Sequence, residues 1–146
     1  MTPLQCSLGL GSNSVIGGTT LMRVSYVRIS TNEKGASCFE DCYSDLAPGY
    51  AVPPAPPLFS RDFTKAGQCF WIGAPPTWGG QVPHPVPRRQ IFVTVSGEYE
   101  VSVGDGVTRR FPPGAVLVLE DTTDMGHSTR VVSAQDVFVF GVTMEE

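Results

Sequence analysis

The chain has 146 residues, the length of one domain, and 41% of them are hydrophobic, which excludes an intrinsically disordered protein. Its formal net charge is −4 and its only lysines are Lys34 and Lys65, so no nucleic-acid partner is expected. No apolar run approaches the roughly 20 residues of a membrane span, and no membrane partner is expected either.

The N-terminal stretch and the cysteines favour a cytoplasmic protein. The first residues, MTPLQCSLGLGSNSVIGG, contain neither a basic segment nor a long apolar one, so no signal peptide is predicted. The cysteines are spaced neither like a zinc module nor like a Cys-x-x-Cys redox motif: Cys6, Cys38, Cys42 and Cys69. Together these features predict reduced thiols and a cytoplasmic location.

Along the chain, residues 1–19 are predicted to form a flexible N-terminal arm and residues 20–146 a single domain. No segment sustains the apolar i, i+3, i+4 pattern of a helix. Alternating and β-branched runs predict strands at residues 21–30, 39–44, 68–72, 91–96, 99–103, 107–111, 115–119, 127–132 and 136–142.

The segment 48–57, PGYAVPPAPP, interrupts this strand pattern. Because proline cannot donate to a sheet, we predict polyproline-like backbone there, lying over the domain or reaching to a partner subunit. Glycine-containing turns at 96–98 and 104–106 and a Pro-Pro-Gly corner at 112–114 separate the later strands. Many short strands joined in this way predict an all-β antiparallel sandwich or barrel.

The stretch VPHPVPRRQ precedes the strand that ends at the turn glycine Gly97. Counted back from Gly97, Gln90 stands seven residues earlier, and His84 and Val86 precede it as a pair separated by one residue. This spacing resembles the first motif of the cupin family, His-x-His, three or four residues, Glu, six residues, Gly. In that comparison Val86 replaces one histidine and Gln90 replaces the glutamate.

A second motif follows at Gly114. Glu120 stands where cupins usually have proline, and His127 follows after a slightly long loop. Over residues 80–142 the chain therefore resembles the cupins, which implies a double-stranded β-helix, that is, a jelly-roll barrel, for the domain. The fold alone leaves the function open, because one barrel hosts many chemistries.

The resemblance also implies a place for a metal, but the ligand set is incomplete. Metal-binding cupins usually offer two histidines and a glutamate from the first motif and a histidine from the second. Here only His84 and His127 remain, so we expect no bound cofactor. The alternative is a divalent metal (Fe, Mn, Zn or Ni) on these two histidines, with a replacement carboxylate from Glu120, Asp121 or Asp124.

Strand alternation predicts which side chains face the barrel interior. If His84 faces inward, so do Val86, Arg88, Gln90, Phe92 and Thr94, whereas Arg89, Ile91, Val93 and Val95 face outward. An unpaired buried Arg88 would cost several kcal/mol. We therefore expect either a polar, water-filled lumen or an ion pair of Arg88 with Glu120 or Asp121. His127 and Thr129 share one face, and His127 is expected near His84 and Gln90.

These residues favour a metal-independent acid/base enzyme, a lyase, dehydratase, isomerase or cyclase of small-molecule or secondary metabolism. His127 would carry the proton with help from Asp121 or Glu120, and Gln90 and Arg88 would hold a substrate oxygen. For His84 a catalytic and a structural role are both open. For His127 the alternative is a purely structural role, in which hydrogen bonds to Asp121 or Asp124 hold its loop in place. Phe92, Thr129, Trp71 and Trp78 are the further candidates for substrate contact, the tryptophans as an apolar wall.

Two other functions remain open: a metal-dependent dioxygenase with a degenerate two-histidine site, and a non-catalytic small-molecule-binding module. A homodimer is expected in each case. Ile91, Val93 and Val95 offer an apolar surface, and exposed strand edges tend to pair with another chain.

Overall fold

A computed structural model describes residues 5–6, 14–16 and 19–145, which form strands and connecting turns without a helix. No helix capable of crossing a membrane occurs in these ranges. The chain divides into two compact units, Met1–Tyr26 with Asp41–Thr64, and Val27–Glu40 with Lys65–Glu146. The strands are β1 (Gln5–Cys6), β2 (Ser14–Ile16), β3 (Thr19–Thr31), β4 (Ser37–Tyr50), β5 (Leu58–Ser60), β6 (Ala66–Ala74), β7 (Gly79–His84), β8 (Gln90–Ser96), β9 (Tyr99–Ser102), β10 (Thr108–Phe111), β11 (Val116–Leu119), β12 (His127–Val131) and β13 (Val137–Met144).

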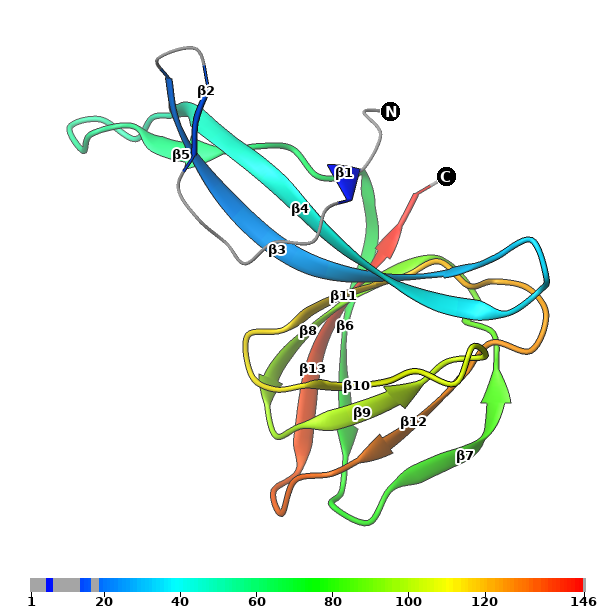
Figure 1. The fold of residues 1–146 in the computed structure, drawn as a ribbon. Coiled ribbons are helices and arrows are strands. Elements are labelled where there is room, and N and C mark those ends of the chain that lie inside the picture. Colours follow the sequence, from blue (N-terminus) through cyan, green and yellow to red (C-terminus); the bar gives the residue numbers. More distant parts are fainter. Residues whose placement is uncertain (1–4, 7–13, 17–18, 146) are drawn as a thin grey trace. The chain divides into compact units, whose positions relative to one another are not determined.

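The second unit contains a jelly roll made of strands β6 to β13. One sheet has the order β11-β8-β13-β6 and the other the order β10-β9-β12-β7 (Figure 1). Apart from the β9–β10 hairpin, which lies within one sheet, successive strands alternate between the sheets in the two-Greek-key order of an eight-stranded jelly roll. The all-β fold class predicted from the motifs is therefore confirmed. The strands were expected to be antiparallel, and one pair differs. The end of β3 lies parallel to β11, with Val27 opposite Leu117 and Ile29 opposite Leu119.

The space between the two sheets is filled by apolar side chains. Alternate residues of facing strands are buried there, for example Leu117 and Leu119 of β11 against Tyr99 and Val101 of β9. The predicted alternation in β8 is also found, since Thr94 is buried and Val95 is half exposed. The interior is thus a packed core, and Thr94, the Tyr99 hydroxyl, Asp121 and His127 are among its buried polar groups.

The strand predicted least well is β7, the segment Gly79–His84. Its two glycines and Pro83 argued against a strand, because proline lacks the N–H that a sheet needs. β7 lies at the edge of its sheet, next to β12 alone, where one side of the backbone needs no partner. That edge position explains how the histidine-bearing segment can carry proline and still pair.

The first unit contains the outer parts of the β3–β4 hairpin together with β1, β2 and β5. The Nε of Arg23 donates to Asp45 at 2.8 Å. The proline-rich segment 48–57 differs from its prediction, because residues 48–50 belong to β4 and pair with β5. The register shifts between Pro48 and Tyr50, as expected for a residue without an N–H. The predicted arm at 1–19 lies largely outside the described residues.

Candidate functional site

The two histidines of the chain meet at one end of the barrel. His84 is the last residue of β7 and His127 the first of β12, and they stand opposite each other in the antiparallel pairing. Their ring centroids are 5.5 Å apart, with the planes tilted by 48°. His127 is buried and His84 is exposed. The expected approach of the two motif histidines is thus found, and it joins a buried imidazole to one that solvent reaches.

Asp121 orients the buried imidazole. Its Oδ2 lies 2.6 Å from Nδ1 of His127, and the carboxylate is fully buried. An ionised carboxylate can only accept, so opposite a carboxylate Nδ1 is the donor of this hydrogen bond. A neutral imidazole that donates from Nδ1 keeps its lone pair on Nε2 and can accept a proton there.

Ser37 completes this group, and no sequence signal pointed to it. Its Oγ donates to Oδ2 of Asp121 at 2.8 Å, the same oxygen that accepts from His127. Ser37 is buried at the start of β4, 84 positions before Asp121 in the chain. The other oxygen of Asp121, Oδ1, has no hydrogen-bond partner within the described part of the chain.

Backbone contacts hold the two histidine segments together. The N–H of Val86 donates to the carbonyl of Asp121 at 3.0 Å. Gly126 has a φ of 72° and packs so closely on the His84–Pro85 peptide that a Cβ there would overlap the His84 carbonyl. Only glycine satisfies both conditions. The loop 120–126 is therefore docked on the segment that carries His84.

The two positions where cupins have further ligands are occupied by poor metal ligands. Val86 is buried in the apolar core, and Gln90 is half buried at the start of β8, opposite Leu119 and Thr143. Within the described ranges no group of three or more His, Cys, Asp and Glu side chains is placed to hold a metal ion. The hydrogen bond of Nδ1 to Asp121 leaves Nε2 as the ring nitrogen of His127 that is not used in that contact.

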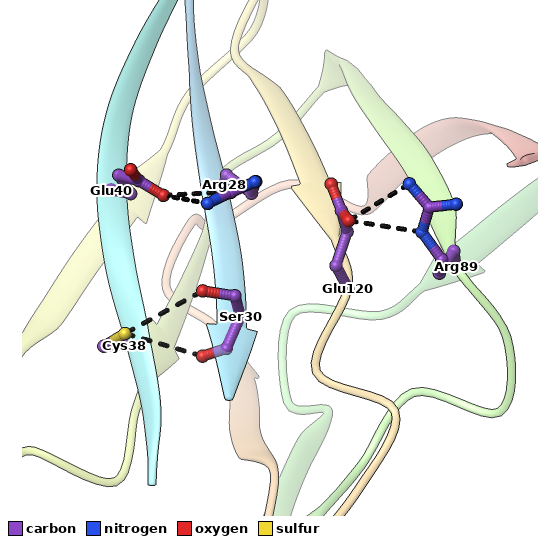
Figure 2. A network of polar contacts seen from close by, with 6 residues as sticks. All are labelled: Arg28, Ser30, Cys38, Glu40, Arg89 and Glu120. Atoms are coloured by element: carbon purple, nitrogen blue, oxygen red, sulfur yellow. Dashed lines mark hydrogen bonds and ion pairs between the residues drawn. The ribbon is translucent and has the colours of Figure 1, made fainter. Parts of the chain in front are cut away.

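The ion pair with Glu120 that was expected for Arg88 is made by Arg89 instead. Arg88 is exposed, and its neighbour Arg89 makes the ion pair with Glu120, Nη2 to Oε2 at 3.1 Å (Figure 2). The reason is strand parity, since Arg89 and Glu120 both lie on the outer face of the sheet. Arg28 and Glu40 form a second pair nearby on β3 and β4. The guanidinium of Arg88 is thus left facing solvent at the histidine end of the barrel.

The aromatic candidates do not gather around the histidines. Phe92 does face the interior, edge-on to Phe70 at 6.3 Å, but in the apolar core. Trp71 lies on the outer face, opposite Phe140, and is 66% exposed. Trp78 precedes β7 and therefore lies at the opposite end of that strand from His84. The remaining candidate, Thr129, lies on β12 with His127. It is half buried and stands opposite Gly80 of β7.

Two pKa shifts occur on β9, the strand next to β12. Burial raises the pKa of Tyr99 far above its ordinary value, so this interior hydroxyl stays protonated. The adjacent Glu100 faces the other side of the same strand, and the hydrogen bond from Arg130 lowers its pKa.

Comparison of the sequence with models of protein families and with curated proteins finds no match. Among solved structures, the Schizosaccharomyces pombe Cnp3 cupin domain is similar to this chain, with 16% sequence identity, coverage of 84% of each chain and a TM-score of 0.42. At this identity the likeness concerns the fold alone, and the jelly-roll assignment rests on the strand order itself.

Proposed function

We propose that this protein is a metal-independent enzyme that moves a proton on a small, partly apolar carbonyl compound, in an isomerisation, dehydration or cyclisation. The observation that supports it is the buried Asp121–His127 pair at 2.6 Å with the exposed His84 beside it. A carboxylate, an oriented imidazole and a second imidazole open to solvent are the parts that general acid/base catalysis needs.

In this proposal Nε2 of His127 removes a proton from the carbon next to the substrate carbonyl. The electron pair of the broken C–H bond moves to the carbonyl oxygen and gives an enolate. Asp121 remains a carboxylate and stabilises the imidazolium that forms on His127. In an isomerisation His127 returns the proton to a different carbon. In a dehydration the proton from the C–H bond stays on His127, and a second proton, from the imidazolium of His84, goes to the hydroxyl of the substrate. The C–O bond breaks as the enolate re-forms the carbonyl, water leaves, and transfer of the proton from His127 to His84 restores both imidazoles.

The enolate needs a positive partner, and Arg88 is the candidate. Its exposed guanidinium belongs to the segment between β7 and β8, close in sequence to both His84 and Gln90. A guanidinium binds a carboxylate or enolate oxygen through two parallel hydrogen bonds. We therefore propose a substrate that carries a carboxylate beside its reactive carbonyl, with Gln90 as a further donor.

Hydrogen exchange tests this function without knowledge of the natural substrate. A panel of 2-oxo and 3-oxo carboxylic acids is incubated in D2O, and the loss of the C–H signal beside the carbonyl is followed by proton NMR. We expect the wild type to accelerate the exchange of at least one acid and His127→Ala to return it to the buffer rate. The matched control is Val107→Thr in the exposed β9–β10 turn. Equal rates for wild type and His127→Ala would refute the proposal.

Metal dependence is tested on the same protein. We expect elemental analysis of protein purified without chelators to find metal well below one equivalent, and exchange to persist in EDTA. Stoichiometric metal together with loss of exchange in EDTA would instead favour the two-histidine dioxygenase. Tight binding of an acid without any exchange would favour the binding module. The cytoplasmic location and the homodimer belong to this proposal, and the homodimer is tested below.

A further inference from the structure

We infer that Ser37 is a positioning residue for His127 and acts through Asp121. The inference concerns the orientation of the imidazole, and its consequence for catalysis rests on the proposed function. Ser37 lies in neither cupin motif, and it comes from the β3–β4 hairpin, outside the eight strands of the jelly roll.

The argument starts from the oxygen that the two side chains share. Oδ2 of Asp121 accepts from Oγ of Ser37 at 2.8 Å and from Nδ1 of His127 at 2.6 Å. The two donors approach from different strands, Ser37 from β4 and His127 from β12. Two donors on one oxygen determine the rotation of the carboxylate about its Cβ–Cγ bond. They thereby determine which oxygen faces the imidazole.

Burial makes the contribution of Ser37 large. Asp121 is fully buried, and Oδ1 has no hydrogen-bond partner among the described residues. The hydroxyl of Ser37 is therefore one of two side-chain donors that the structure records on this carboxylate. A buried carboxylate that loses a donor loses part of the hydrogen bonding that replaces its hydration. Without Ser37 the carboxylate is also free to turn, and the preference of His127 for hydrogen on Nδ1 weakens.

Ser37 itself is held by the backbone around it. In the preceding turn, Oδ1 of Asn32 accepts from the N–H groups of Lys34 and Ala36 at 2.9 and 3.0 Å. From the other side, a Cβ at Gly104 would lie 3.2 Å from the backbone nitrogen of Ser37, so the β9–β10 turn packs directly on it. The hydroxyl is thus presented from a fixed backbone, which is what positioning requires.

The tautomer of His127 is the direct readout. Protein labelled with 15N-histidine is studied by two-bond 1H–15N correlation at alkaline pH, where imidazoles are neutral. We expect hydrogen on Nδ1 of His127 in the wild type and a shift towards the Nε2–H form in Ser37→Ala. We expect Ser37→Thr, which keeps a hydroxyl, to restore the wild-type pattern. Deuterium exchange should fall about tenfold in Ser37→Ala, the order expected for one hydrogen bond to a charged group.

The matched control is Ser30→Ala, which removes a serine hydroxyl from the same hairpin. Ser30 contacts Cys38 (Figure 2), and the side-chain hydrogen bonds recorded for Asp121 in the described residues come from Ser37 and His127. We expect Ser30→Ala to leave the His127 tautomer unchanged. A folded Ser37→Ala with the wild-type tautomer would overturn the inference. If that variant does not fold, Ser37→Cys replaces it, because a thiol is a much weaker donor, and an unchanged tautomer there would overturn the inference equally.

The two proposals fail in different ways. A changed tautomer in Ser37→Ala upholds the positioning role even if no acid is exchanged by the wild type, in which case only the proposed function falls. Exchange that depends on His127 but is the same in Ser37→Ala, with the same tautomer, refutes the role of Ser37 and leaves the proposed function standing.

Discussion

Oδ2 of Asp121 and Nδ1 of His127 lie 2.6 Å apart in a place that solvent does not reach. The two residues flank one loop, and that loop also packs on the backbone of His84 through Gly126. A carboxylate, its imidazole and the neighbouring imidazole are therefore positioned by a single short segment. Substitutions in this loop should therefore change the geometry of the histidine site more than that of the barrel.

The first prediction concerns the charge of Asp121. Asp121→Asn keeps the size of the side chain but replaces an oxygen that only accepts by an amide that also donates. We expect deuterium exchange to fall by roughly 10²–10⁴-fold, the contribution of a positioned base. Exchange kinetics measure this. Asp105→Asn is the control, since it lies in an exposed turn and keeps an acceptor for the N–H of Val107. Equal losses in both variants would contradict the role of Asp121.

The second prediction concerns Gly126. A Cβ there would overlap the carbonyl of His84, and the φ of 72° adds left-handed strain. We expect Gly126→Ala to lose clearly more than the roughly 1–2 kcal/mol that left-handed strain alone costs, as measured by urea unfolding. Gly106→Ala separates the two effects, because Gly106 has a φ of 90° and open space around it. Similar losses in the two variants would mean that the contact with His84 is unimportant.

The third prediction concerns pH. The Nε of Arg130 donates to Glu100 at 2.8 Å and lowers the pKa of that carboxyl. Because the folded pKa lies below the unfolded one, this stabilisation is present above the unfolded pKa and disappears as the pH falls through the folded pKa. We expect the urea concentration at the midpoint of unfolding to decrease as the pH is lowered below about 5 in the wild type, and to decrease less in Glu100→Gln. Glu33→Gln, in an exposed turn, serves as the control. Parallel curves for wild type and Glu100→Gln would contradict the prediction.

The fourth prediction concerns self-association. A row of apolar side chains crosses the outer face of the β6–β13–β8–β11 sheet, with Trp71, Phe140, Val93 and Val116 opposite one another on its strands. Trp71 is 66% exposed and Val95 is 50% exposed. With no charged side chain in this row, a second copy of the same face is a suitable partner.

Light scattering coupled to size exclusion measures the mass. We expect a homodimer for the wild type and a monomer for Val95→Glu. Val107→Glu introduces the same charge at an exposed valine of the β9–β10 turn and should stay dimeric. A monomeric wild type would contradict the expected homodimer.

The predicted strands and the two histidines could be read from the sequence because their signals are local. Alternation of apolar residues, glycine turns and a proline corner act over a few residues, and every strand predicted from them is present. The β7 segment was missed because glycine and proline are poor strand formers, and only its edge position makes them acceptable.

The outward position of Trp71 shows where such local reasoning stops. Trp71 was a candidate for an apolar wall in contact with substrate, but pairing opposite Phe140 places it on the outer face. The same applies to the arginine pair, in which Arg89 and not Arg88 meets Glu120. One residue of register decides which side chain faces a partner.

The sequence by itself determined the strand pattern, the jelly-roll motifs and the two histidines that stand opposite each other. Only the tertiary structure decided that Ser37 and His127 share one oxygen of Asp121. The physical reason is distance along the chain. A hydrogen bond between side chains 84 positions apart depends on how a hairpin packs against a loop, and no local pattern of residues encodes that packing.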